Sequence, residues 1–336
     1  RNLLAMHVVR LGNGEEFDLD TGSIILDSAA KSGVTLPYSC KTGRCSTCKC
    51  KVLSGSTRAM HPEIGLSREE KAQGWILSCV RVAETDISLE VNGLEGVALP
   101  TIKTLPCKIS RLERLSDDVM RVLLRLAPSQ DFEFIPGQHV EVIGPNGIRR
   151  SYSLAKANFA DRLLELHIRA VADGVMSHYW FNQANVNDLL RINGPMGTFF
   201  LRDTFEIDLI FLATGTGIAP VKAMLESLNQ RRREERPKSI TLLWGGRRVH
   251  DLYLDVNEIP GDFNYLPVLS RPEDDWSGAT GYVQDVLLAS KPELRSAVVY
   301  ACGSDAMIRS ARASLLKAGL AEENFFSDAF VTSGSN

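Results

Sequence analysis

The sequence predicts a multidomain fold in three parts: a small α+β domain, an antiparallel β-barrel and an α/β domain built on a parallel sheet. Short strand patterns surround one helix in the first part, alternating apolar runs fill the middle, and continuous apolar strands alternate with helices in the last. Gly- and Pro-rich stretches punctuate the chain between these parts. We therefore expect domains at residues 1–92, 105–203 and 204–336, with a linker at 93–104.

The first part shows short strands around a single helix. A strand is expected at residues 6–11, and further strands are expected near 51–53 and 87–91. Between them, the stretch SIILDSAAKSG predicts a helix that Ser23 caps and that ends at Gly33. Strands that wrap one helix are typical of a small α+β fold.

The middle part contains runs in which apolar and polar residues alternate. Examples are MRVLLRL at 120–126, QHVEVIG at 138–144 and LLELHIRAV at 163–171. Alternation with a period of two puts one face of each strand in a core, and turn residues separate the runs. An antiparallel barrel is therefore expected.

The hydrophobic period changes in the last part. The apolar stretches DLIFLAT, ITLLWGG, NYLPVLS and SAVVYACG alternate with helical patterns near 220–230, 281–290 and 305–318. In the last helix Met307, Ile308, Ala311 and Leu315 share one face, and Gly319 ends it. Continuous apolar strands between helices predict a parallel sheet that is covered on both faces.

Composition excludes several classes of function. The net charge is −3, from 41 acidic and 38 basic residues, so a general affinity for nucleic acid is not expected. No apolar run approaches the ~20 residues that cross a bilayer, and residues 1–10 do not resemble a signal peptide. Seven cysteines, an odd number in a long chain, fit a reducing cytoplasm with a metal site better than a secreted disulfide scaffold.

Four cysteines form the strongest motif. Cys40, Cys45, Cys48 and Cys79 have the spacing C-x4-C-x2-C-x30-C, with three close ligands and one distant. This is the spacing of plant-type [2Fe–2S] proteins, in which one loop wraps the cluster. Gly43 is small enough to let backbone amides reach the sulfurs, and those hydrogen bonds tune the reduction potential.

Two other interpretations of these cysteines remain open. A zinc site usually has two close cysteine pairs, whereas this stretch has a single C-x2-C. A structural or disulfide role is the other alternative. Cys50 is expected to be a buried small residue on the following strand instead of a ligand.

The stretches LPYSCKTGRCSTCKCKVLSG and GWILSCV resemble the plant-type ferredoxin family. The resemblance implies a β-grasp fold for the first domain and a [2Fe–2S] cluster bound by the four cysteines. The sequence departs from the family at Ser46, where glycine is usual. Because serine is small, we expect a modest effect on the backbone amides near the cluster.

A second motif lies in the middle part, at Arg150-Ser151-Tyr152-Ser153. Side chains alternate along a strand, so Arg150 and Tyr152 share one face. An arginine can bind a pyrophosphate with two hydrogen bonds, a tyrosine can cover a flat ring system, and Ser153 can bond the edge of a flavin. The motif alone is also compatible with an ordinary strand.

The surrounding motifs make the flavin interpretation specific. PGQHVEV precedes the motif, GVMS follows at Gly174–Ser177, and NGPMGTFFL comes next. This order resembles the ferredoxin–NADP⁺ reductase superfamily over residues 105–336. The resemblance implies an FAD-binding barrel, in which Gly174–Ser177 lies near the pyrophosphate and Phe330 lies beside the isoalloxazine. In the barrel the residues expected to bind cofactor are Arg150, Ser151, Tyr152, Ser153, His167, Arg169, Gly174, Val175, Met176 and Ser177, and Phe330 of the last domain is expected to join them.

A glycine-rich turn follows the first strand of the last part, in DLIFLATGTGIAP. Gly215 and Gly217 permit close approach of the backbone to a ligand, and Pro220 suits the first turn of a helix. The N-terminus of such a helix favours a pyrophosphate. Although the turn is not G-x-G-x-x-G, it resembles the pyridine-nucleotide turn of the reductase superfamily, which implies that Gly215, Thr216, Gly217 and Pro220 bind the nucleotide.

Cys302 follows the strand pattern AVVYA. One interpretation is a small buried residue at the end of a strand. The resemblance implies another, a thiol beside C4 of the nicotinamide, and on that interpretation Cys302 and Ser153 are the expected catalytic residues.

The choice between NADH and NADPH depends on charge near the ribose. The 2′-phosphate of NADPH needs cationic partners, for which Arg247, Arg248 and Arg271 are candidates. Acidic residues at 273–275 follow Arg271 and would repel a phosphate. NADH is therefore expected, with NADPH as the alternative.

The three domains together predict an enzyme that passes electrons from NAD(P)H through FAD and a [2Fe–2S] cluster to a separate protein. The stretches RRSYSLA, GVMSHYWF, NDLLRINGPMGTFFLR and YACGSDAMI resemble CDP-6-deoxy-Δ3,4-glucoseen reductases, which implies a dehydrase partner. The domain order also resembles reductase components of ring-hydroxylating oxygenases, which implies an oxygenase partner. A redox carrier or sensor without enzymatic activity is a third possibility, although a carrier needs no nucleotide-binding turn.

Overall fold

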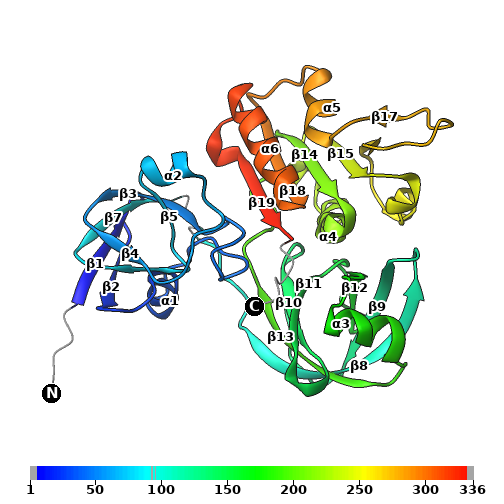
Figure 1. Ribbon diagram of the computed structural model, residues 1–336, viewed down its shortest axis with the longest axis horizontal. Coiled ribbons are helices and arrows are strands. Elements are labelled where there is room, and N and C mark those ends of the chain that lie inside the picture. The colour runs from blue at the N-terminus through cyan, green and yellow to red at the C-terminus, as the bar shows by residue number, and fades with distance from the viewer. Residues whose placement is uncertain (1–5, 92–93, 95, 331–336) are drawn as a thin grey trace. The chain divides into compact units, whose positions relative to one another are not determined.

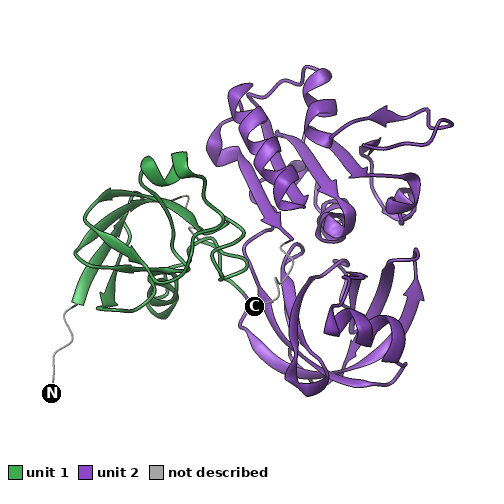
Figure 2. Cartoon of the chain, in the orientation of Figure 1, with its two compact units in different colours: residues 1–99, 331–336 green, residues 100–330 purple. Residues whose placement is uncertain are grey.

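The computed structural model describes residues 6–91, 94 and 96–330. Residues 93 and 95 of the expected linker lie outside this description, as do residues 1–5, 92 and 331–336 at the ends of the expected domains. The described chain forms two compact units, which meet in sequence between Leu99 and Pro100 (Figure 2).

The first unit is a five-stranded mixed sheet with one helix of seven residues, α1, Ile25–Lys31 (Figure 1). The strand order is β2-β1-β7-β3-β5, and β1 pairs parallel with β7. The strands are β1 (Met6–Leu11), β2 (Glu16–Asp20), β3 (Lys49–Ser54), β5 (Trp75–Leu77) and β7 (Ile87–Glu90). A separate two-stranded ribbon joins β4 (Thr57–Ala59) to β6 (Arg81–Ala83), and α2 spans Arg68–Ala72. The predicted α+β fold is confirmed.

The predicted cap of α1 is wrong. Ile24, and not Ser23, is the N-cap, and no side chain caps the helix. The reason is tertiary: Ile24 forms an antiparallel bridge with Val82, which holds its backbone extended until the helix begins at Ile25. The predicted end is correct, because Gly33 adopts a positive φ of 76° just after the helix.

The second unit begins with an antiparallel six-stranded sheet that forms a nearly closed barrel. Its order is β11-β10-β13-β8-β9-β12. The strands are β8 (Lys103–Arg114), β9 (Val119–Leu126), β10 (His139–Ile143), β11 (Arg149–Ser153), β12 (Leu163–Arg169) and β13 (Leu189–Met196). The predicted antiparallel barrel is confirmed, and β8 begins two residues before the expected domain start at 105.

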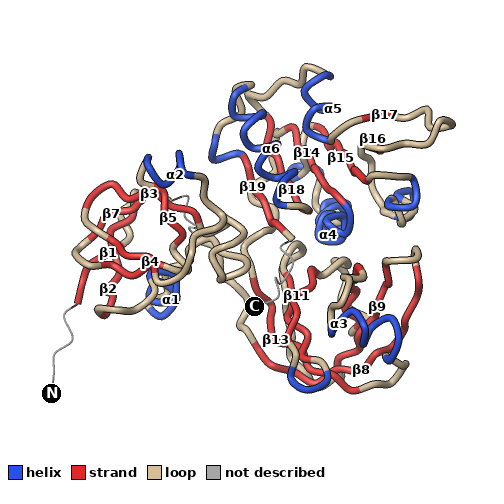
Figure 3. Tube along the Cα trace, in the orientation of Figure 1, coloured by secondary structure: helices blue, strands red, loops and turns tan. Residues whose placement is uncertain are grey.

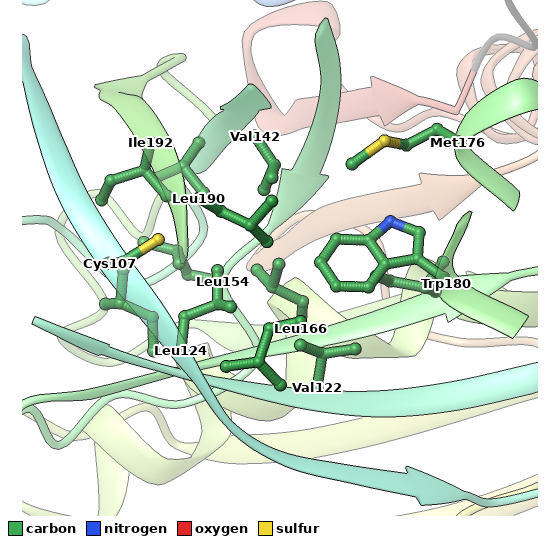
Figure 4. Close-up of a cluster of buried hydrophobic side chains, with 14 of the residues drawn as sticks. Cys107, Val122, Leu124, Val142, Leu154, Leu166, Met176, Trp180, Leu190 and Ile192 are labelled. Atoms are coloured by element: carbon green, nitrogen blue, oxygen red, sulfur yellow. The ribbon is translucent and has the colours of Figure 1, made fainter. Parts of the chain in front are cut away.

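Alternating side chains fill the inside of the barrel. Figure 4 shows aliphatic side chains from several strands packed with the indole of Trp180 and the thioether of Met176. Both residues come from the helical segment after β12, in which α3 (Val175–His178) is continued by a π-helical turn, Tyr179–Gln183. This segment therefore closes the barrel core with its apolar face.

The rest of the second unit is a six-stranded parallel sheet of order β17-β16-β15-β14-β18-β19 (Figure 3). The strands are β14 (Asp208–Thr214), β15 (Ser239–Gly246), β16 (Asn264–Leu269), β17 (Ala279–Thr280), β18 (Ala297–Gly303) and β19 (Phe325–Ala329). The helices are α4 (Ile218–Asn229), α5 (Val283–Ala289) and α6 (Asp305–Lys317). The predicted α/β fold is confirmed, and the predicted apolar face of α6 is buried.

Two strands of this sheet, the two-residue β17 and the longer β19, were not predicted. β19 pairs with β18 at the edge, and its first three residues are only half-buried, so its sequence lacks the continuous apolar run of the central strands.

Among the described residues, no helix is long and apolar enough to span a membrane.

The barrel core supplies a matched test of packing. Leu124 is fully buried inside the barrel, whereas the side chain of Leu189 on β13 is 72% exposed. We expect Leu124→Ala to lower the free energy of unfolding by ~2–5 kcal/mol, because it removes buried methyl groups and leaves a cavity. Leu189→Ala should change it by no more than ~0.5 kcal/mol. Urea unfolding of both variants measures the difference, and equal midpoints would contradict this packing.

Candidate functional site

The four cysteines of the predicted metal motif come together in the first unit. Cys40, Cys45 and Cys48 lie on the loop between α1 and β3, and Cys79 lies between β5 and β6. Their side chains form two hydrogen-bonded pairs, Cys40 with Cys45 and Cys48 with Cys79. Each iron of a [2Fe–2S] cluster needs two sulfur ligands from the protein, so a two-plus-two arrangement fits such a cluster.

Among the described residues, no group of three or more His, Cys, Asp or Glu side chains has the geometry of a site for one metal ion. The pairing of the four thiols is compatible with the two-iron interpretation.

Hydrogen bonds shift the acidity of the thiols in a pairwise manner. The bond from Cys45 lowers the pKa of Cys40 to about 4, and the same bond together with burial raises the pKa of Cys45 well above its usual range. The bond from Cys48 lowers the pKa of Cys79 in the same way. Because metal ligands must be thiolates, one sulfur of each pair is already favoured in the required form.

Backbone N–H groups also point at these sulfurs. The amide of Thr42 donates to Sγ of Cys40 at 3.3 Å, and the amide of Cys40 approaches Sγ of Cys45 at 3.4 Å. The amide of Gly43 donates to Cys79 and lowers its pKa. Donors of this kind stabilise negative charge on cluster sulfurs.

Three positions of the loop have left-handed backbone: Lys41, Gly43 and Ser46. Gly43 has a φ of 75°, and a Cβ there would lie 2.6 Å from the carbonyl oxygen of Pro62, so only glycine fits. Ser46 has a φ of 57°, which explains why glycine is usual at this position in the ferredoxin family. The loop retains its fold with serine there.

A buried ion pair that the sequence did not reveal supports the Cys79 turn. Glu63 is 5% exposed and accepts hydrogen bonds from the backbone N of Leu77 at 2.7 Å and from Nη2 of Arg81 at 2.6 Å. Leu77 and Arg81 each lie two residues from Cys79. The carboxylate therefore ties both sides of the turn to the segment that covers the cluster loop.

The predicted flavin motif lies on β11. Its tyrosine accepts a hydrogen bond from Nε1 of Trp180 at 3.1 Å, and burial raises the pKa of Tyr152 to about 12. Ser153 is buried at the end of the strand, while Ser151 is exposed and Arg150 is partly exposed. The alternation thus separates the four side chains as predicted, with Arg150 and Tyr152 on one face.

The predicted phosphate-binding segment opens a helix, as expected. Gly174 is the N-cap of α3, and its backbone leads directly into the helical turn. Val175 is exposed, whereas Met176 is buried. Ser177 has a structural contact, because its hydroxyl accepts a hydrogen bond from the backbone N of Val171 at 2.7 Å and so closes the loop before the helix.

The glycine-rich turn forms a short 3₁₀ segment, Gly215–Gly217, between β14 and α4. A Cβ at Gly217 would lie 2.2 Å from the carbonyl oxygen of Cys302, so this glycine is required by close packing. Pro220 lies in the first turn of α4, as predicted. The structure therefore brings the turn and Cys302 together at the carboxyl edge of the sheet, where ligands of open α/β folds bind.

Cys302 is fully buried, and burial raises the pKa of its thiol well above the usual range. The group is therefore a neutral thiol at physiological pH. The backbone N of Phe330 donates to the carbonyl oxygen of Gly303 at 2.8 Å, which places the predicted aromatic residue next to the end of β18.

Residues from the barrel complete this region. The guanidinium group of Arg169 lies 3.4 Å from the position that a Cβ of Gly215 would occupy. Among the described residues, its buried Nε and Nη2 atoms belong to the few buried side-chain nitrogens with no hydrogen-bond partner. Unpaired buried donors are costly, so they mark a place where an anionic group of a cofactor fits.

His167 lies two residues before Arg169 and so faces the same side of β12. Its Nδ1 atom is 2.9 Å from the hydroxyl of Tyr253, which follows β15 in the α/β part. Sequence reasoning singled out His167 and Arg169, but it missed four partners that surround them: Glu165, Lys222, Trp244 and Tyr253. Along β12 the polar residues Glu165, His167 and Arg169 alternate with three buried apolar residues, so they share the other face of the strand. This pattern in the sequence could have indicated a polar cluster.

Comparison with protein families finds three matching segments, which together cover most of the chain. Residues 9–84 match the 2Fe-2S iron-sulfur cluster binding domain, 106–201 the oxidoreductase FAD-binding domain, and 211–313 the oxidoreductase NAD-binding domain. These segments contain the cysteine loop and most of the barrel and of the parallel sheet.

Individual relatives match the chain from end to end. A CDP-6-deoxy-L-threo-D-glycero-4-hexulose-3-dehydrase reductase of Yersinia pestis is 40% identical over 98% of this chain and 100% of its own. The electron transfer component of the xylene/toluene monooxygenase of Pseudomonas putida is 32% identical over 95% and 92%. The crystal structure of an Amycolatopsis cytochrome P450 reductase superposes with a TM-score of 0.74 at 29% identity, over 98% of this chain and 100% of that one.

These matches cover all three domains in the same order, and the relatives are named reductases or electron transfer components. The chain is therefore a member of the family of iron–sulfur flavoprotein reductases that join a [2Fe–2S] domain to FAD- and NAD-binding domains.

Proposed function

We propose that this enzyme takes electrons from NADH and delivers them through FAD and its [2Fe–2S] cluster to a dehydrase that acts on a CDP-linked 6-deoxyhexulose. The observation that carries this proposal is the 40% identity to the Yersinia dehydrase reductase along the full length of both chains. When bound, the nicotinamide supplies a hydride, the flavin accepts two electrons and releases them singly, and the cluster carries one at a time.

We also propose roles for the predicted site residues. Cys40, Cys45, Cys48 and Cys79 would bind the cluster, with one pair on each iron. The proposed FAD contacts are Arg150, Ser151, Tyr152, Ser153, Gly174, Val175, Met176, Ser177 and Phe330. The nucleotide would bind at Gly215–Gly217 and Pro220 with Arg169 and His167 nearby, where unpaired guanidinium donors support an anionic ligand. Ser153 and Cys302 would then be the residues at the reacting rings.

The domain division that fits these roles is 1–92, 105–203 and 204–336, with a linker at 93–104. We place the enzyme in the cytoplasm, because four thiols that must stay reduced to bind a cluster favour a reducing compartment.

A second candidate partner is an oxygenase component. It is favoured by the 32% identity to the xylene/toluene monooxygenase component over 95% of this chain. The two candidates differ in the partner protein and not in the internal electron path.

Coupled turnover with purified partners distinguishes the two candidates. We expect NADH oxidation to depend on a CDP-6-deoxyhexulose dehydrase and its substrate, and an oxygenase with an aromatic substrate should give no more than the background rate. Coupling to the oxygenase alone would replace the first proposal with the second. Failure of NADH to bleach the flavin in the isolated protein would overturn both.

Cys79→Ala separates the cluster from the flavin. We expect this variant to lose the visible absorption of the cluster and its reduction of cytochrome c, since a [2Fe–2S] centre needs four ligands. NADH-dependent reduction of ferricyanide should remain, because the flavin can serve that acceptor directly. Cys50→Ala is the matched control, since Cys50 is a buried neighbour that lies outside the four-thiol set. Equal loss of both activities in folded, FAD-loaded Cys79→Ala would contradict a linear electron path.

The preference for NADH is supported by an ion pair. Arg248 follows β15, and its guanidinium group pairs with the carboxylate of Glu273. The backbone N atoms of Arg247 and Arg248 both donate to Asp251, which adds a second negative charge to this loop. A 2′-phosphate would therefore meet a neutralised arginine and a nearby acid.

We expect Glu273→Gln to raise kcat/KM for NADPH about tenfold. The reason is that the freed Arg248 can form one charge-assisted hydrogen bond to the 2′-phosphate, and ~1.4 kcal/mol from that bond corresponds to a factor of ten. The value for NADH should change little, and the control is Asp262→Asn, which removes an exposed carboxylate outside the 273–275 segment. Steady-state kinetics with both nucleotides tests this, and an unchanged NADPH-to-NADH ratio would show that the ion pair does not set specificity.

A further inference from the structure

A buried chain of polar side chains crosses from the barrel to the parallel sheet within the second unit. The hydroxyl of Tyr253, on the segment between β15 and β16, is 2.9 Å from Nδ1 of His167 on β12. On the other side of the ring, Nε2 of His167 is 2.7 Å from Oε1 of Glu165. The two rings meet edge to face, with centroids 5.5 Å apart.

The ionisation of the three groups indicates which atom of each pair carries the proton. Burial alone would raise the pKa of Glu165, but the hydrogen bond from His167 and the nearby cations lower that pKa to about 2. The carboxylate is therefore ionised and accepts a hydrogen bond from Nε2–H of His167. Burial lowers the pKa of His167, so the ring is neutral and Nδ1 accepts. Burial raises the pKa of Tyr253, so its hydroxyl stays protonated and donates a hydrogen bond to Nδ1 of His167.

Charged residues hold the carboxylate end in place. Nζ of Lys222 lies 3.4 Å from Oε2 of Glu165 and 2.6 Å from Glu226, and Nε of Arg121 lies 3.2 Å from Oε1 of Glu165. Nζ of Lys222 also donates to the backbone oxygen of Ala155, at 3.0 Å. Lys222 is in α4, five residues after Gly217. Because buried charges are stable only when paired, this cluster fixes α4 against the barrel.

The hydroxyl end of the chain leads to the nucleotide turn. The ring of Tyr253 packs edge to face on Trp244, with centroids 5.3 Å apart, and Nε1 of Trp244 donates to the backbone oxygen of Gly215 at 3.0 Å. Arg169, on the same face of β12 as His167, approaches Gly215 from the barrel side. The Tyr253–His167 bond is thus a direct side-chain link between the strand that carries Arg169 and the residues that support the turn, beside the ion pair of Lys222 with Glu165 on the same strand.

We propose that Tyr253 and His167 are positioning residues for hydride transfer, which hold the barrel and the nucleotide turn at the separation that transfer requires. This inference rests on the proposed function, in which NADH binds at the turn and FAD in the barrel. Hydride transfer needs the reacting atoms about 3–3.5 Å apart, so a small displacement between the two parts slows it strongly. The binding of either cofactor alone does not require that separation.

Tyr253→Phe tests the inference, since it keeps the ring and removes the hydrogen bond. We expect the limiting rate of flavin reduction by NADH in stopped-flow experiments to fall ~10–100-fold. The primary kinetic isotope effect with NADH deuterated at the transferred position should rise. Calorimetric Kd for NAD⁺ and FAD content should stay close to those of the parent protein, while Tm should fall by no more than a few °C, because one buried hydrogen bond is lost. Tyr265→Phe, which removes a hydroxyl from β16 in the same sheet, is the matched control.

Two substitutions of His167 keep one hydrogen bond each. The amide of His167→Asn can occupy the position of Nδ1 and retain the bond to Tyr253, whereas the amide of His167→Gln can occupy the position of Nε2 and retain only the bond to Glu165. We therefore expect His167→Asn to transfer hydride faster than His167→Gln. Combining Tyr253→Phe with His167→Gln should cost no more than His167→Gln alone, because both remove the same bond.

The outcomes separate this inference from the proposed function. If the parent protein reduces its flavin with NADH but Tyr253→Phe does so at the parent rate, the positioning role is wrong. Additive losses in the double variant, or a parallel loss of NAD⁺ affinity and Tm with an unchanged isotope effect, would also overturn it. If the parent protein does not react with NADH, the proposed function itself fails.

Discussion

The contact between the nucleotide turn and the end of β18 is the constraint on which the second unit depends. The carbonyl oxygen of Cys302 occupies the space where a side chain at residue 217 would begin, 2.2 Å from that position. In the same way, Oγ1 of Thr214 lies 2.1 Å from the place of a Cβ at Gly303 and accepts from the backbone N of Ser304 at 3.1 Å. The absence of a Cβ at residues 217 and 303 thus allows two neighbouring parallel strands, and the turn after one of them, to pack in direct contact.

The polar cluster around Glu165 shows how this turn is related to the barrel. Lys222 is buried on a helix whose neighbouring positions are apolar, and its charge is compatible with that place only because two carboxylates and a backbone oxygen surround it. Apolar packing alone tolerates sliding between surfaces, whereas short bonds between charged groups define one relative position. The cluster therefore contributes specificity of arrangement more than stability.

Much of the architecture was predictable because it follows from local patterns. The strand at 208–214 and the buried face of α6 were predicted from hydrophobic periodicity alone, and the cysteine spacing predicted which thiols would meet. The errors have tertiary causes: Ile24 displaces Ser23 as the cap of α1 because it bridges to Val82, more than fifty residues away in sequence. Tyr253 and Lys222 escaped notice for the same reason, since their partners lie in another domain and no local pattern marks them. Glu63 resembles an ordinary surface acid until the fold brings Arg81 and the backbone of Leu77 to it.

The complete burial of Cys302 has a consequence for the chemistry of sulfur in this protein. Thiolates, and not thiols, react with alkylating agents and peroxides, and they must also be reached by them. With no exposed surface and a raised pKa, Cys302 meets neither condition. Burial thus keeps this sulfur out of reach of oxidants in the solvent, whereas Cys40, whose pKa is lowered and which is only partly covered by protein, is the more reactive thiol of the two when it is free.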